Sequence, residues 1–303
     1  MKLILASLIF FKSNLSWSEL PIRPTEPNHP SSAIYTYGFK REKIVFQGRE
    51  MFLYLPISEV KDSNLKFPLL VFGHGQAIGH EGYELTFEHL ARKGTAVLFS
   101  KYDKNFFDRN WQRMASDFNR QTGHVLKIFS HLLDPESVIY TGHSKGAYVG
   151  LVALGEQTLK QMNFKVRAAV FFSPAGFDEK NIEQINSTIP ISIIWPEKDQ
   201  IIKSTLVYEI FNRLPNIHKQ FILVKSYDDL EIDHFFPLSK SYIFGGQNGL
   251  YAYHYYGVWK WLLGAVDDVT QGGQLNNRYL YGDLASSTGV DNLKHEITRS
   301  WSR

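Results

Sequence analysis

Six short, nearly continuous apolar runs recur along the middle of the chain, and helical segments separate them. A strand covered on both faces is apolar throughout, whereas a strand with one exposed face alternates apolar and polar residues. Runs of the first kind that alternate with helices are typical of a doubly wound, mostly parallel sheet. The sequence therefore predicts an α/β fold. The six runs are Pro68–Phe72, Ala96–Ser100, Val138–Thr141, Ala168–Ser173, Ile191–Trp195 and Gln220–Val224.

An antiparallel hairpin is expected before the parallel strands, because Gly48 separates two β-rich runs, Lys43–Gln47 and Glu50–Leu55. No internal repeat interrupts the pattern, so we expect one domain over residues 35–303, with Tyr279–Tyr281 as a candidate extra strand. Apolar spacing and stop signals indicate the helices. These are Tyr83–Arg92, a long helix with its apolar face from Met114 to Leu132 and its end at Pro135, Ala147–Leu154, Leu206–Leu214 and Val258–Val269.

The N-terminus has the pattern of a secretory signal. Lys2 precedes the apolar run Leu3–Phe11, which is much shorter than the roughly 20 residues that span a bilayer. Small residues follow at Ser16 and Ser18, where a signal peptidase requires them. We expect residues 1–18 to be a signal peptide, with export to the periplasm or medium and no stable membrane insertion. The alternative is a short buried helix.

A proline-rich leader occupies residues 19–34. Proline recurs there at every third position, which favours an extended, polyproline-like segment over packed structure. The prolines are Pro21, Pro24, Pro27 and Pro30.

Composition excludes several classes of function. The 303 residues carry a formal charge of only +3 and no basic cluster, so nothing indicates binding to nucleic acid. The absence of cysteine excludes disulfides, thiolate zinc sites and cysteine nucleophiles. Nothing in the composition fixes the oligomeric state.

The segment Gly142–Gly146 reads Gly-His-Ser-Lys-Gly, a G-x-S-x-G sequence. An apolar strand leads into it and a helix of small apolar residues leaves it. In this strand–turn–helix context a serine sits on a tight, strained turn with its hydroxyl exposed, and glycines flank it because backbone approaches from both sides. Ser144 is therefore the candidate nucleophile, and the alternative is an ordinary strand-to-helix turn.

A serine nucleophile needs a base and an acid that orients the base, in the chain order Ser, acid, His. Asp199 follows the strand Ile191–Trp195 and is the candidate acid, with Glu197 as the competitor. His234 lies in the loop after the last of the six strands and is the candidate base. The later His254 and His295 are weaker candidates.

The developing oxyanion needs two backbone donors. One is expected from Lys145, the residue after the nucleophile, and the other from Gln76, in the loop after the strand Pro68–Phe72. We assign His74 a structural role. The acids around His234 resemble a metal cluster, but no second histidine lies nearby, so we expect no metal and no cofactor.

Together these residues resemble the α/β-hydrolase superfamily over about residues 40–265. Within it, the chain is similar to chlorophyllase-type, dienelactone-hydrolase-type and polyester-hydrolase-type serine esterases. Pro196 stands where members usually have glycine before the acid, which keeps Glu197 open as the alternative.

Many members insert a helical cap where this chain has only 17 residues, between Ser173 and Ile191. We therefore expect no cap domain and an open cleft. Tyr242–Tyr256, which is rich in tyrosine, is either one wall of that cleft or core packing.

The resemblance implies hydrolysis of small-molecule or polymeric carboxylic esters through an acyl-enzyme on Ser144. Acyl transfer or peptide hydrolysis by the same residues is the first alternative. A catalytically silent binding protein on the same fold is the second. The residues do not indicate the acyl chain length or the physiological substrate.

Overall fold

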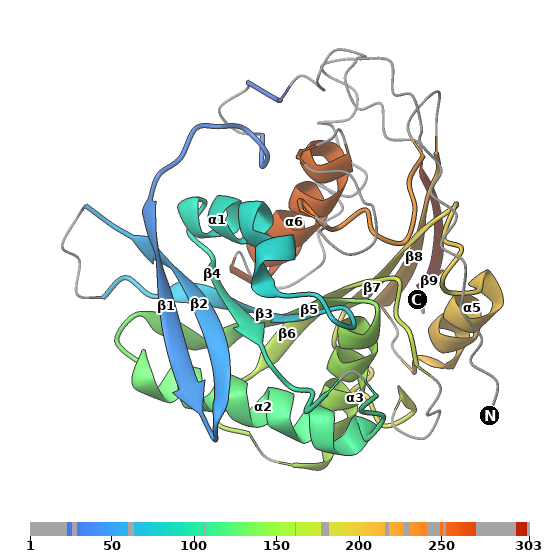
Figure 1. Cartoon of the computed structure of the whole chain (residues 1–303), viewed down its shortest axis with the longest axis horizontal. Helices are drawn as coiled ribbons and strands as arrows, with labels where there is room; N and C mark the ends of the chain where they lie inside the picture. Colours follow the sequence, from blue (N-terminus) through green and yellow to red (C-terminus); the bar gives the residue numbers. More distant parts are fainter. Residues whose placement is uncertain are drawn as a thin grey trace, which may run out of the picture.

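The computed structural model describes residues 23–25, 29–59, 64–105, 107–160, 162–176, 182–215, 218–226, 231–240, 249–250 and 253–270, and the backbone of 295–301. Within these residues nine strands form one sheet, in the order β1-β2-β4-β3-β5-β6-β7-β8-β9 (Figure 1). The parallel part of the sheet consists of β4, β3, β5, β6, β7 and β8. The strand β2 pairs antiparallel with β4, β1 pairs antiparallel with β2, and β9 pairs antiparallel with β8. The strands are β1 (Gly38–Phe46), β2 (Arg49–Ile57), β3 (Phe67–Gly73), β4 (Ala96–Ser100), β5 (Leu133–His143), β6 (Val166–Phe172), β7 (Ile191–Pro196), β8 (His218–Val224) and β9 (His295–Trp301).

The predicted mixed α/β architecture is confirmed, with its mostly parallel sheet and its N-terminal hairpin. Gln47 and Gly48 form the two-residue hairpin turn with φ of 52° and 75°. Positive φ at both positions matches the right-handed twist of the two strands, which is why glycine serves there.

Helices cover both faces of the sheet (Figure 1). Alternate residues of the central strands point to opposite faces, so each strand contributes to two cores. In β3, for example, Leu69 and Val71 pack in the core with α2, α3 and α5, whereas Leu70 and Phe72 pack in the core with α1 and α6. The helices are α1 (Glu84–Arg92), α2 (Trp111–Ile128), α3 (Lys145–Leu159), α5 (Ser204–Arg213) and α6 (Trp259–Thr270), with a π-helical turn η2 (His254–Val258) before α6 and a 3₁₀ turn η1 (His80–Gly82) before α1.

The predicted end of the long helix is wrong. Helix α2 ends at Ile128, and the next strand begins at Leu133. Pro135 lies inside β5, where the register with β3 shifts between Leu133 and Val138. A proline is tolerated at such an irregularity because no ladder hydrogen bond is required from its nitrogen.

The described part of the proline-rich leader packs against the domain, so the prediction of an unpacked leader is wrong for these residues. Ser31 and Ser32 are fully buried. The guanidinium of Arg23 donates to the carbonyl of Ser31 over 2.8 Å and lies over the ring of Trp259 in α6. His89 of α1 donates from Nε2 to the carbonyl of Pro30 over 3.0 Å.

The candidate strand Tyr279–Tyr281 lies outside the described residues, as do the expected signal peptide 1–18 and leader residues 19–22 and 26–28. The C-terminal strand that the structure does describe is β9, which pairs with β8. Among the described helices, none has the length and apolar character needed to cross a bilayer.

Candidate active site

The sheet has a topological switch at β3. The chain passes from β3 to β4 on one side and then crosses back to β5 on the other side. At such a point the loops beyond the carboxyl ends of adjacent strands diverge, and doubly wound sheets bind ligands there. Gly73, which ends β3, pairs in register with Gly142 of β5. The predicted oxyanion loop and the G-x-S-x-G turn are therefore neighbours at this edge.

Ser144 occupies a strained turn between β5 and α3. Its φ of 55° and ψ of −121° are disfavoured for any residue other than glycine and cost on the order of 1–3 kcal/mol. Two hydrogen bonds hold this backbone: Ser144 N–H donates to the carbonyl of Phe172 over 2.9 Å, and Ala175 N–H donates to the carbonyl of Ser144 over 3.1 Å. The loop after β6 thus fixes the turn from the other side.

Three glycines allow this turn to contact the end of β3. A Cβ added at Gly146 would lie 2.1 Å from the carbonyl carbon of Gly73 and 2.6 Å from the nitrogen of His74. A Cβ added at Gly142 would lie 2.7 Å from the carbonyl carbon of Gly146. None of these three distances is tolerable for a side chain, so the spacing of glycines around Ser144 follows from backbone packing.

An acid–base pair is formed by residues that follow two further strands. Nδ1 of His234 lies 2.7 Å from Oδ2 of Asp199, and the two side chains are 3% and 0% exposed. The other carboxylate oxygen, Oδ1, accepts from the backbone N–H of Ile201 over 2.9 Å and of Ile202 over 2.8 Å. An ionised carboxylate only accepts hydrogen bonds, so the neutral imidazole carries its proton on Nδ1 and has a lone pair on Nε2.

The competing acid lies elsewhere. Glu197 is exposed, and its Oε2 accepts from the backbone N–H of Ser226 over 3.3 Å. Pro196 ends β7, and its carbonyl accepts from Asp199 N–H over 3.2 Å, a bond that needs no N–H from the proline. Proline at this position therefore fits the turn that presents Asp199.

The loop after β3 contains Gln76. Ile78 N–H donates to the carbonyl of Gly75 over 3.1 Å and closes a turn with Gln76 and Ala77 at its centre. The φ of Ala77 is 61°, so the turn is backbone-strained. Gln76 is half-buried in this turn.

Lys145 is the first residue of α3, and the first backbone N–H groups of a helix have no partner within the helix. They carry the positive end of the helix dipole, which favours a negative charge nearby. Since Gly146 contacts Gly73 and His74, the start of α3 and the loop with Gln76 lie against each other.

Sequence reasoning missed Asp103, which follows β4 and lies beside the turn that carries Ser144. Its carboxylate is 3.5 Å from His74 Nε2 and 3.6 Å from Lys145 Nζ, and all three side chains are buried. Burial opposes ionisation of Asp103, but its contact with His74 and the charges of Lys101 and Lys145 outweigh this and lower its pKa. Burial also lowers the pKa of Lys145, an effect that the negative charge of Asp103 partly offsets.

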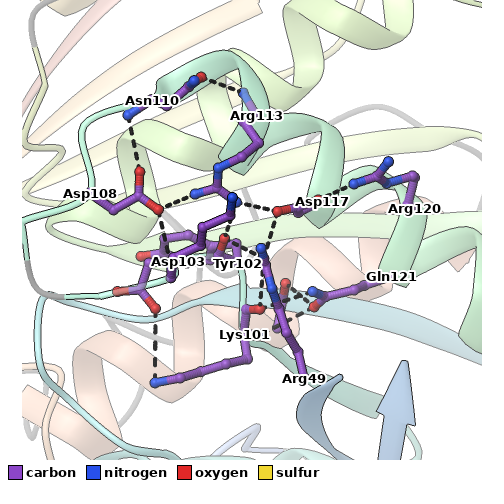
Figure 2. A network of polar contacts seen from close by, with 12 residues as sticks. Arg49, Lys101, Tyr102, Asp103, Asp108, Asn110, Arg113, Asp117, Arg120 and Gln121 are labelled. Atoms are coloured by element: carbon purple, nitrogen blue, oxygen red, sulfur yellow. Dashed lines mark hydrogen bonds and ion pairs between the residues drawn. The ribbon is translucent and has the colours of Figure 1, made fainter. Parts of the chain in front are cut away.

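A polar network holds the segment that carries Asp103 (Figure 2). Arg49 of β2 and Arg113 of α2 both donate to the carbonyl of Tyr102, over 2.6 and 3.1 Å, and both pair with Asp117. Tyr102 in turn donates from its hydroxyl to the carbonyl of His74 and stacks on the His74 ring. The network therefore connects α2 to the loop after β3, and His74 has the structural role that the sequence suggested.

The remaining predictions concern the weaker candidate bases, His254 and His295, and the tyrosine-rich segment Tyr242–Tyr256. His254 is fully buried, donates to the carbonyl of Leu238 over 3.2 Å, and has its pKa lowered to about 3 by burial. Of the predicted aromatic segment, Tyr253, Tyr255 and Tyr256 are buried in the core with α6, and Tyr242 lies outside the described residues. His295 opens β9 opposite Val224.

Within the part of the chain that the structure describes, no cluster of three or more metal-ligating side chains occurs. Residues 228–230 of the acidic loop lie outside that part. Comparison with protein-family models and with curated proteins finds no match for this chain.

Proposed function

We propose that the protein is a serine hydrolase with an α/β-hydrolase fold that cleaves carboxylic esters. The observation that carries the proposal is the pairing of His234 with Asp199. Both residues follow strands that come after Ser144, and Ser144 itself has a strained backbone conformation. Nucleophile, acid and base occur in the chain order that this fold uses. The sheet order supports the same assignment, because it gathers the ends of β3 and β5 at a switch point.

In the first half of the reaction, Nε2 of His234 accepts the proton of the Ser144 hydroxyl, and Oγ bonds to the ester carbonyl carbon. The carbonyl oxygen becomes an anion, which the backbone N–H groups of Gln76 and Lys145 stabilise. Asp199 keeps the imidazole in its reactive tautomer and stabilises the imidazolium. His234 then protonates the leaving alcohol as its bond to the carbonyl carbon breaks.

In the second half, water replaces the alcohol. His234 accepts a proton from the water, the oxygen attacks the acyl-enzyme carbonyl, and the same two donors stabilise the second oxyanion. Protonation of Ser144 Oγ by His234 releases the carboxylic acid and restores the resting state. No metal or cofactor takes part in either half.

We also propose that the chain is exported. The signal-like segment at residues 1–18 directs the chain to the periplasm or the medium, where its substrates are small or polymeric esters. Sequencing the N-terminus of the protein recovered from an expressing bacterium tests this. We expect the mature chain to begin at Glu19, and an intact Met1 would contradict export by this route.

Substitution of the nucleophile tests the enzymatic proposal. Ser144→Ala should lower kcat on short-chain esters by at least about 10³-fold, as in other hydrolases of this type. Its melting temperature should stay within a few degrees, because alanine at 144 carries the same backbone strain. Ser137→Ala, within β5 and seven positions before Ser144, is the matched control and should keep full activity. Turnover by Ser144→Ala close to wild type would contradict the proposal.

A further inference from the structure

A continuous chain of buried hydrogen bonds connects the loop after β3, the serine turn and the loop after β8. Gly75 N–H donates to the hydroxyl of Tyr83 over 3.0 Å, and that hydroxyl lies 2.9 Å from Nδ1 of His143. Nε2 of His143 lies 2.8 Å from the carbonyl oxygen of His234. Tyr83, His143 and His234 are all at most 3% exposed. We call these four residues the Tyr83–His143 relay.

Only one arrangement of protons satisfies every bond in the relay. The carbonyl of His234 can only accept, so His143 carries its proton on Nε2. Nδ1 of the neutral imidazole then accepts, and the Tyr83 hydroxyl must donate to it. Gly75 N–H can only donate, and it uses a lone pair of the Tyr83 oxygen. Burial lowers the pKa of His143 and raises that of Tyr83, so both groups stay in the neutral forms that this pattern needs.

Three members of the relay either precede or are residues with a proposed role in the reaction. Gly75 precedes Gln76, and His143 precedes Ser144. The contact between the two segments is tight, since a Cβ at Gly75 would lie 3.0 Å from Nδ1 of His143. His234 is held at two points, by Asp199 through its ring and by His143 through its backbone.

We propose that Tyr83 and His143 are positioning residues that keep the Gln76 donor and the His234 base in register with Ser144. The inference rests on the proposed function. Misplacement of a reacting group by about 1 Å can cost about 10²-fold in rate, so a relay that fixes three loops at once affects kcat without touching the substrate.

Substitutions at Tyr83 and at His143 remove individual hydrogen bonds of the relay. Tyr83→Phe keeps the ring, which packs on Phe72 at 4.5 Å between centroids, and removes only the hydroxyl. His143→Asn keeps an acceptor near the Nδ1 position and loses the donor to His234. His143→Gln keeps a donor near the Nε2 position and loses the bond to Tyr83.

The leaving group of the ester reports which loop has moved. A nitrophenyl ester needs little protonation of its leaving group, whereas an alkyl ester needs a proton from His234. Loss of the oxyanion donor slows both substrates alike. We therefore expect Tyr83→Phe and His143→Gln to lower kcat on both esters by about 10- to 100-fold with KM changed less than threefold. His143→Asn should slow the alkyl ester several times more than the nitrophenyl ester.

The measurement is kcat and KM for both esters, with rates divided by the number of sites that a fluorophosphonate titrates. Titration removes any contribution from misfolded protein. Tyr140→Phe is the matched control, since it also removes a buried hydroxyl, which donates to Asn119 over 2.6 Å on the opposite face of the sheet. It should lower stability and leave kcat per titrated site unchanged.

Wild-type values of kcat per site in Tyr83→Phe and His143→Asn would overturn the relay while leaving the esterase intact. An equal loss in Tyr140→Phe would also overturn it, because a general packing effect would then explain the result. A wild-type chain that neither reacts with the fluorophosphonate nor hydrolyses any ester would overturn the proposed function and the relay with it.

Discussion

Nδ1 of His234 and Oδ2 of Asp199 lie 2.7 Å apart, although 35 positions and the strand β8 separate the two residues in the chain. The two backbone bonds to Oδ1 of Asp199 restrain the carboxylate that faces His234. If Asp199 orients His234, then loss of the negative charge of Asp199 should lower turnover far more than it lowers stability.

Asp199→Asn should therefore lower kcat by about 10⁴-fold, because an amide can donate to Nδ1 and stabilise the unreactive tautomer. Glu197→Gln changes the same functional group two residues away, at an exposed side chain that contacts Ser226, and should change kcat less than about twofold. Steady-state rates on one short-chain ester compare the two. The reverse result would make Glu197 the orienting acid.

The contact between Gly146 and Gly73 predicts an effect of a single methyl group. Gly146→Ala would place Cβ 2.1 Å from a backbone carbon, so the turn must shift, and both activity and stability should fall, stability by about 1–3 kcal/mol. Gly123→Ala, within helix α2, is the control, since the added Cβ would meet only the side chain of Phe164, at 3.7 Å. It should raise stability by about 0.5–1 kcal/mol, because alanine is the better helix former.

Denaturant unfolding and ester turnover measure both glycine variants. An active and stable Gly146→Ala would contradict the close backbone contact on which the geometry of the serine turn depends.

Stability should fall in mild acid because of buried histidine. Burial lowers the pKa of His254 to about 3, whereas an unfolded histidine has a pKa of about 6.5. As pH falls below that value, the unfolded state binds a proton that folded His254 does not, and stability is lost at about 1.4 kcal/mol per pH unit until pH reaches the folded pKa. Stability is fully present above the unfolded pKa.

Comparison with His254→Gln isolates this contribution. Between pH 7 and pH 5 the variant should lose about 2 kcal/mol less free energy of unfolding than wild type. His131→Gln, at an exposed histidine, should lose as much as wild type. Equal losses in all three proteins would mean that His254 does not remain neutral in the fold.

Two lysine–carboxylate pairs should differ in energy for reasons other than distance. Lys145 Nζ is 3.6 Å from Asp103 with both side chains under a tenth exposed, whereas Lys165 Nζ is 2.6 Å from Glu136 with both more than half exposed. Lys145→Met leaves a buried carboxylate with one fewer cation and should cost about 1–3 kcal/mol. Lys165→Met should cost under about 1 kcal/mol. Chemical unfolding of both variants decides the comparison, and a larger loss in Lys165→Met would contradict it.

The strands and the serine turn could be predicted because each has a sequence pattern of its own. Continuous apolar runs indicate buried strands, and glycines on both sides of Ser144, between a strand and a helix, indicate a tight turn. The edge of the sheet where Asp199 and His234 meet follows from parallel strands, whose carboxyl ends lie together. These inferences need no knowledge of which side chains touch.

The contacts of Tyr83, His143 and Asp103 could not be predicted in this way. Tyr83 and His143 are 60 positions apart, and His143 and His234 are 91 apart. Tyr83 looked like the start of an apolar helix, and His143 like a variable position of the motif. Similarly, Leu132 fitted the apolar stripe of α2, but the chain had already left the helix at Ile128. Periodicity shows that a helix exists and not where neighbouring strands end it.

The reactivity of Ser144 tests the central claim most directly. The purified chain is treated with a fluorophosphonate, digested, and its peptides are weighed by mass spectrometry. A hydroxyl activated by the His234–Asp199 pair should form one covalent adduct, on the peptide that contains Ser144, at a rate that falls strongly in Asp199→Asn. A chain that stays unmodified, or one labelled at another serine as readily as at Ser144, would contradict the account.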